Sequence, residues 1–86
     1  MRITWAIEGQ GSGEATAETV DEAADALTHA VRESYADHDT GTVAHVMLNV
    51  VAPIRMQLVT DGRFEVERGH VWEHQGQGIF VTLSPN

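Results

Sequence analysis

An amphipathic repeat that begins at a helix-capping motif sets the strongest limit on the fold of this chain. Thr19 is followed three residues later by Glu22. At this spacing the threonine hydroxyl can cap the glutamate amide while the glutamate carboxylate reaches back. Apolar and small residues then recur at helical spacing, at Val20, Ala23, Ala24, Leu27, Ala30, Val31, Ser34 and Tyr35. The pattern predicts one amphipathic helix over about 20–36.

The segment before this helix is typical of a hairpin. The first eight residues alternate, with Ile3, Trp5 and Ile7 on one face, as in a half-buried strand. The glycine-rich segment 9–13 would form a turn, and residues 14–17 could pair back as a short second strand.

Beyond residue 40 the pattern predicts further antiparallel strands. Pro53 interrupts an alternating run, and Asp61-Gly62 is the strongest hairpin signal in the chain. The strand-like segments are residues 42–52, 54–59, 63–67, 71–74 and 79–83.

One helix can cover only one face of such a sheet. We therefore expect a single domain over residues 1–86 with an α+β fold. Its form would be a two-layer sandwich, with one amphipathic helix on a mainly antiparallel sheet of five to six strands (β-β-α-β-β-β-β). The expected core joins Leu27, Val31 and Tyr35 of the helix to Ile3, Trp5, Val46, Leu48, Met56 and Phe64 of the sheet. If Leu48 is in that core, Leu48→Ala should cost about 2–4 kcal/mol.

Acidic residues dominate the charge of the chain. Thirteen Asp and Glu stand against five Arg and no Lys, for a net charge of −8. Residues 1–40 hold nine of the acids and only two arginines. Direct binding to DNA, RNA or anionic lipid is therefore not expected, because those partners select basic clusters. A basic protein partner suits this charge.

Seven acids around the predicted helix are the candidate partner-binding residues: Glu18, Asp21, Glu22, Asp25, Glu33, Asp37 and Asp39. Carboxylates one helical turn apart lie about 5–6 Å from each other, within a factor of two of the phosphate spacing along DNA. Such a stripe can occupy a nucleic-acid channel in a basic partner. The structural alternative stays open, since acids in a first helical turn each stabilise the helix dipole by about 0.3–1 kcal/mol.

Motifs for catalysis or cofactor binding are lacking, so we expect neither an enzyme nor a bound cofactor. The spacing Gly9-x-Gly11-x-Gly13 is not that of a phosphate-binding loop, and Glu14 would repel a phosphate. No serine lies in a nucleophile elbow, and there is no cysteine.

The five histidines do not predict a metal site. His70 and His74, with Trp72 between them, would lie about 13 Å apart along a strand, too far to share a zinc ion. Asp25 and His29 are typical of a solvated ion pair one helical turn apart. Residues 37–41 resemble half a calcium loop without its distal glutamate.

Surplus apolar residues indicate a second binding surface. Residues Val43, Met47, Val51, Val59 and one of Trp72 or Phe80 cannot all lie under one short helix. They predict a partner surface or a homodimer on the outer sheet face. We expect a cytoplasmic protein without membrane contact, because no uninterrupted apolar run reaches about 18–20 residues and no secretory signal is present.

Together these features favour a small protein-binding inhibitor that occupies the basic, nucleic-acid-binding surface of a partner. In general character the chain is similar to small acidic phage-encoded anti-CRISPR and other anti-defence proteins. It is also similar to immunity proteins that neutralise bacterial toxins. No residue roles are carried over from either class. A self-associating accessory domain is the remaining alternative.

Overall fold

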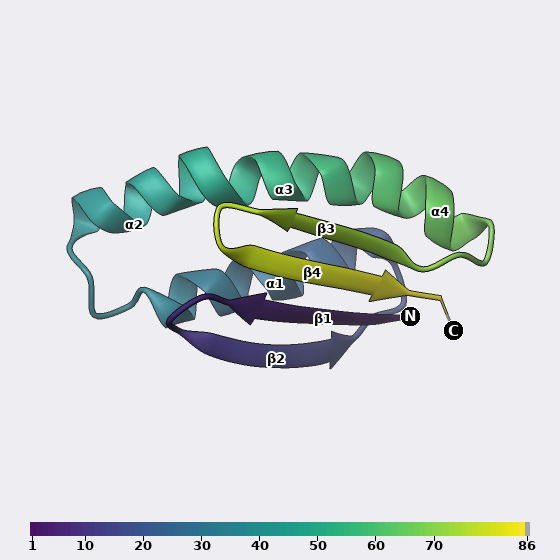
Figure 1. Ribbon diagram of the computed structural model, residues 1–86, viewed down its shortest axis with the longest axis horizontal. Coiled ribbons are helices and arrows are strands. Elements are labelled where there is room, and N and C mark those ends of the chain that lie inside the picture. Colours follow the sequence, from purple (N-terminus) through teal and green to yellow (C-terminus); the bar gives the residue numbers. More distant parts are fainter. Residues whose placement is uncertain (86) are drawn as a thin grey trace.

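The computed structural model describes residues 1–85 as an α+β fold with an antiparallel sheet (Figure 1). It begins with strands β1 (Arg2–Ile7) and β2 (Gly11–Thr16), followed by helix α1 (Val20–Ser34). One continuous helix, here called the long helix, covers Thr40–Glu67. Strands β3 (Trp72–Gly76) and β4 (Ile79–Ser84) follow it.

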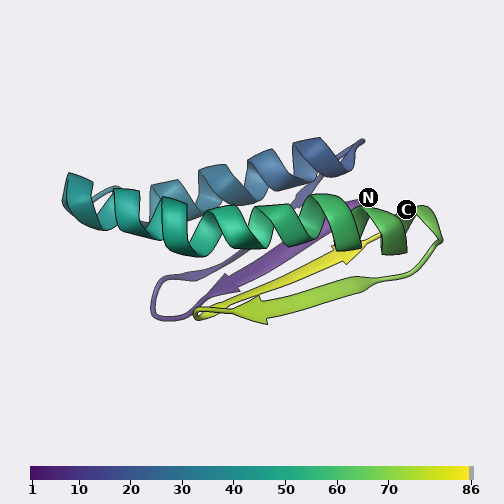
Figure 2. The ribbon, with the colours of Figure 1, turned by 90° about the horizontal axis from the view of Figure 1, so that it is seen from above.

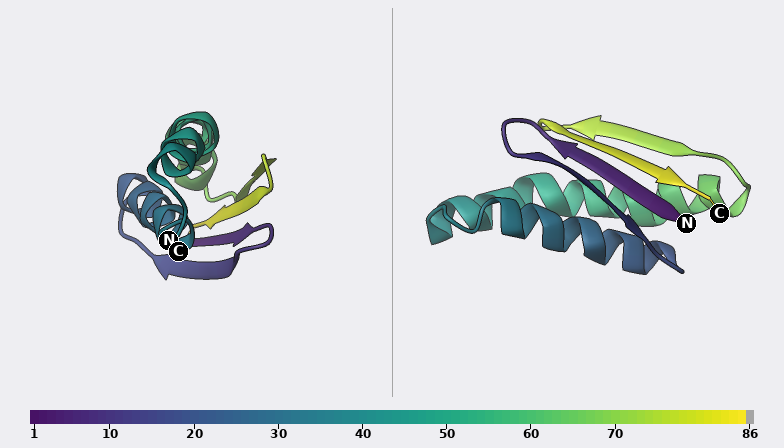
Figure 3. Two further views of the ribbon diagram at one scale, coloured as in Figure 1. Left: turned by 90° about the vertical axis from the view of Figure 1, so that its left-hand side faces the viewer. Right: turned by 90° about the horizontal axis from the view of Figure 1, so that it is seen from below.

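The four strands lie in the order β2-β1-β4-β3, and every neighbouring pair is antiparallel. The first and last strands of the chain thus pair in the middle, with Ile3 opposite Leu83. Both helices lie on one face of this sheet (Figures 2 and 3). The other face is uncovered and mostly polar, although Phe80 is 49 % exposed on β4.

Helix α1 forms as its capping motif predicts. The Thr19 hydroxyl accepts a hydrogen bond from the Glu22 amide at 3.1 Å. The Glu22 carboxylate reaches back to the amide of Glu18 at 3.0 Å, one residue before the position expected for a capping box. Leu27 and Val31 face the core, as expected.

The main error of the sequence-based fold concerns residues 42–67, which are helical and not stranded. The long helix consists of α2 (Thr40–Val46), a π-helical segment (Met47–Val51), α3 (Ala52–Gln57), a second π-helical segment (Leu58–Gly62) and α4 (Arg63–Glu67). The sheet therefore has four strands in place of five to six, and two helices accompany it in place of one.

Pro53 and Gly62, taken as a strand break and a hairpin turn, have other roles. Pro53 has no amide to give to the helix, and the first π-helical segment ends two residues before it, where the bonding register changes. Gly62 has helical backbone angles, φ −63° and ψ −45°. A Cβ there would lie 3.2 Å from the indole of Trp72, so this glycine allows the helix to approach β3 closely.

The long helix repeats its environment every four residues. In an ideal α-helix a four-residue row drifts by about 40° per step, and the wider π-helical turns reduce this drift. One row faces the sheet side and is mostly buried: Val46, Val50, Ile54, Leu58, Gly62 and Val66. The row that we call the outer apolar row is exposed throughout: Ala44, Leu48, Ala52, Met56, Thr60 and Phe64.

This period corrects the predicted core. Ile3 is buried as expected, and Tyr35, Trp5 and Val46 are half-buried. The three remaining predictions are wrong, because Leu48, Met56 and Phe64 are 71 %, 64 % and 59 % exposed. They lie in the outer apolar row, which turns away from the sheet.

Within residues 1–85 the long helix is also the one segment long and apolar enough, by length and composition alone, to cross a membrane. The search for an uninterrupted apolar run missed this helix because polar residues such as Asn49 and Arg55 lie within it. A single helix of this kind is weak evidence, since core helices of soluble proteins meet the same criterion. The absence of membrane contact stays a prediction.

Candidate protein-binding surfaces

Two of the seven candidate acids join the helices to each other. Arg55 of the long helix donates to the Asp25 carboxylate at 2.7 Å and to the Thr28 hydroxyl at 3.0 Å. Eight residues further along, Arg63 donates to the Asp21 carboxylate at 3.0 Å. Both carboxylates remain largely exposed. Asp21 and Asp25 therefore link α1 to the long helix, a role that the strand assignment could not predict.

Two further acids cap helices. Glu22 holds the amide of Glu18, as described above. The Asp39 carboxylate accepts a hydrogen bond from the Thr42 amide at 2.7 Å and caps the long helix. The hydroxyl and then the amide of Thr42 hold the pKa of Asp39 below its usual value, with a smaller contribution from nearby His38.

In the part of the chain that the structure describes, the carboxylates of three of the seven acids neither pair with an arginine nor cap a helix: Glu18, Glu33 and Asp37. Glu18 precedes α1, whereas Glu33 and Asp37 lie at and beyond its other end, about 22 Å away along the helix. His29 and Arg32 lie between them on the exposed surface, and His29 approaches Glu33 at 3.6 Å. The seven acids thus do not form a continuous acidic stripe.

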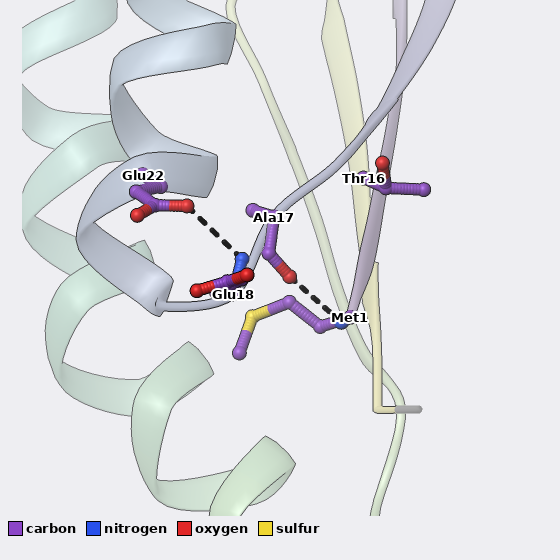
Figure 4. A pocket seen from close by; sticks show the side chains of 5 residues that line it. All are labelled: Met1, Thr16, Ala17, Glu18 and Glu22. Atoms are coloured by element: carbon purple, nitrogen blue, oxygen red, sulfur yellow. Dashed lines mark hydrogen bonds between the residues drawn. The ribbon is translucent and has the colours of Figure 1, made fainter.

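A small open hollow lies where β2 leads into α1 (Figure 4). Met1, Thr16, Ala17, Glu18 and Glu22 line it. The Met1 ammonium donates to the Ala17 carbonyl at 2.9 Å, and the Glu18–Glu22 hydrogen bond crosses its other side. The polar groups here hold the β2–α1 junction together, and they include no pairing of a nucleophile with a base.

The histidines lie apart from one another and have local contacts. His74 stacks on the buried Trp72 with ring centroids 5.6 Å apart, and His70 lies 3.1 Å from the Glu65 carboxylate. His45 contacts Asn49 one turn further along the long helix. Among the described residues, no three His, Asp or Glu side chains gather as metal ligands would.

The apolar surface predicted on the outer sheet face is wrong in its location except for Phe80, which is exposed on that face. Val43, Met47, Val51 and Val59 belong to the inward side of the long helix, and Trp72 is buried under Gly62. The exposed apolar surface is instead the outer apolar row, which the sequence-based reasoning missed. A search for apolar residues at every fourth position, from Ala44 to Phe64, would have found it.

Comparisons with protein-family models, with curated proteins and with solved structures found no match to this chain. The case for function therefore rests on the surfaces described above.

Proposed function

We propose that this protein is a small inhibitor that binds a basic protein partner and covers its nucleic-acid-binding surface, as an anti-CRISPR or other anti-defence protein would. The observation that carries the proposal is that most carboxylates of the chain have no arginine of the same chain to pair with. Three of the five pair with a carboxylate of the same chain, at Glu14, Asp25 and Asp21. Ten of the thirteen acids have no arginine partner within residues 1–85.

This imbalance favours a basic partner for a physical reason. Carboxylates on an exposed surface attract a basic protein over roughly a Debye length, about 8 Å at physiological salt, and so increase the association rate. Within residues 1–85, Glu18, Glu33 and Asp37 are the acids of α1 and its flanks whose carboxylates neither pair with an arginine nor cap a helix, so they are the best candidates for such contacts. The protein would act by occupying the surface, without catalysis or a cofactor.

The structure changes how this proposal is tested. Reversing the charge of Asp21 or Asp25 would place a cation against Arg63 or Arg55 and disturb the helix pair. The test variant is therefore Glu18→Gln/Glu33→Gln/Asp37→Asn. A matched control, Asp61→Asn/Glu67→Gln/Glu73→Gln, removes the same charge from exposed positions elsewhere.

A pull-down from bacterial lysate at low and high salt identifies the partner, and binding kinetics then compare the variants. We expect the test variant to associate more slowly and with a weaker salt dependence than the control. Equal effects of the two variants would show that binding depends on net charge alone and not on these three acids. Unchanged kinetics in both variants would show that the acidic surface does not take part in the interaction, and would refute the proposal.

Two alternatives have observations in their favour. A toxin-neutralising immunity protein would use the same acidic surface, and the identity of the captured partner distinguishes it. A self-associating accessory domain is supported by the outer apolar row, which contains no acid.

A further inference from the structure

The outer apolar row is a long, uninterrupted surface. Its six residues span twenty positions of the long helix, about 30 Å at 1.5 Å per residue. Thr60 adds little polarity, because its hydroxyl donates to the Met56 carbonyl at 2.7 Å. Beyond the sheet, the α2 end of the helix projects freely (Figures 1 and 2).

Few charged side chains lie beside this row as far as Thr60, although the chain carries −8. From Gly41 to Thr60 the helix has one Asp, Glu, Lys or Arg, namely Arg55, and Asp25 already pairs with it. On the α1 side, the structure of residues 1–85 shows one other ion pair along the helix, between Arg63 and Asp21. Among residues 1–85, Asp61 is the one exposed acid directly beside the row within its length, next to Thr60, so a basic partner would find few carboxylates here. Arg68 is the one arginine beside the row without a carboxylate partner in that part of the chain, too little basic charge to favour an anionic membrane.

We infer that two copies of this chain pair through their outer apolar rows, with the two long helices antiparallel. A symmetric pairing requires a surface that complements itself. The row does so when its midpoint lies on the twofold axis. Phe64 of one copy then faces Ala44 of the other, Leu48 faces Thr60, and Ala52 faces Met56.

Each of these three pairs sets a larger side chain against a smaller one. This alternation lets two helices approach closely without leaving voids or forcing clashes, as packed helices at about 8–10 Å require. A parallel pairing in register would instead set Phe64 against Phe64 and Ala44 against Ala44. The order of residue sizes along the row therefore selects the antiparallel arrangement.

The helix ends complement each other in the same arrangement. Arg68 lies over the Phe64 ring at 4.9 Å and pairs with no carboxylate in the part of the chain that the structure describes. Antiparallel pairing brings it to the start of the second copy's long helix, where Asp39 is the cap. The opposed helix dipoles also attract one another. None of these contacts involves Glu18, Glu33 or Asp37, the acids proposed to bind the basic partner.

Light scattering after size exclusion, across about 1–500 μM protein, tests the pairing in a range suited to a modest interface. Wild type should change from monomer to dimer with concentration. Met56→Glu buries a charge at the centre of the interface and should weaken the dimer at least about tenfold. Gln57→Glu adds the same charge to the neighbouring exposed row and should leave the dimer intact. Circular dichroism confirms that both variants fold.

The chain has no cysteine, so introduced thiols report the orientation. Chains carrying Ala44→Cys and chains carrying Phe64→Cys should cross-link when mixed, and neither should cross-link alone. Cross-linking of Ala44→Cys chains with themselves would overturn the antiparallel arrangement. A monomer at all concentrations, or a dimer that survives Met56→Glu, would overturn the interface.

An apolar helix face can also bind a membrane. Flotation with vesicles of phosphatidylcholine, with and without phosphatidylserine, tests this alternative. We expect the protein to remain with the unbound fraction. Vesicle binding by a monomeric wild type, lost in Met56→Glu, would assign the row to a membrane and refute the pairing.

Discussion

Replacing Leu58 or Leu48 by alanine removes the same atoms from the same helix, but the two replacements should differ greatly in the stability that they cost. Leu58 is completely buried between the helices and the sheet. Its replacement should cost about 2.7–5 kcal/mol, the range for buried leucines, out of a total stability of about 4–13 kcal/mol for a domain of this size. Leu48 is 71 % exposed. Full burial of a leucine contributes about 1.5–3 kcal/mol. Because less than one third of Leu48 is buried, its replacement should cost under about 1 kcal/mol.

Urea titration followed by circular dichroism measures both costs. The titration uses about 1 μM protein, below the dissociation constant expected for a weak dimer, so that self-association does not contribute to the measured stability. Unchanged m-values would show that both variants unfold over the same surface. A Leu48→Ala variant as damaged as Leu58→Ala would refute the helical rows and restore the strand assignment, in which Leu48 is a core residue.

Three other perturbations test individual contacts. Gly62→Val should destabilise the fold by about 1–3 kcal/mol, because its side chain would press on the indole of Trp72, and a urea titration would detect the loss. A double-mutant cycle of Asp25→Asn and Arg55→Gln should give a coupling of about 0.2–1 kcal/mol, since both side chains keep contact with solvent. Asp39 has a lowered pKa in the folded state, so its stabilising effect is present above its unfolded pKa of about 4 and is lost as the pH falls through the folded value. Thermal melting between about pH 5 and pH 2 should therefore decline more steeply for wild type than for Asp39→Asn, which keeps a capping side chain.

The elements predicted correctly are those whose local signals agree with each other. Thr19 and Glu22 mark the start of α1, and the alternation around Ile3 matches β1 in its sheet. The last two strands also lie where the sequence places them. In these segments the apolar spacing, the turn residues and the caps all indicate the same element, so reasoning from sequence succeeds.

Residues 42–67 escaped prediction because their signals conflict. Apolar residues are so dense there that both a two-residue and a four-residue period can be traced through Val46, Leu48 and Val50. Gly62 then added a false hairpin signal. Its lack of a side chain instead leaves room for the indole of Trp72, 10 residues further along the chain, and a pattern of neighbouring residues cannot reveal such a contact. The partners of Asp21 and Asp25 were missed for the same reason, since arginines placed on strands cannot line a neighbouring helix.

The two proposed surfaces predict opposite responses to salt, which allows each to fail independently. Binding of a basic partner through free carboxylates weakens as salt screens the attraction. Pairing of two chains that each carry −8 should strengthen with salt, because the buried row is neutral and the screened repulsion between the copies outweighs the screened attraction of Arg68 for Asp39. Measuring both affinities at about 50 and 300 mM salt should therefore give slopes of opposite sign. A dimer that dissociates as salt rises would show that ion pairs such as Arg68 with Asp39, and not the apolar row, hold the two copies together.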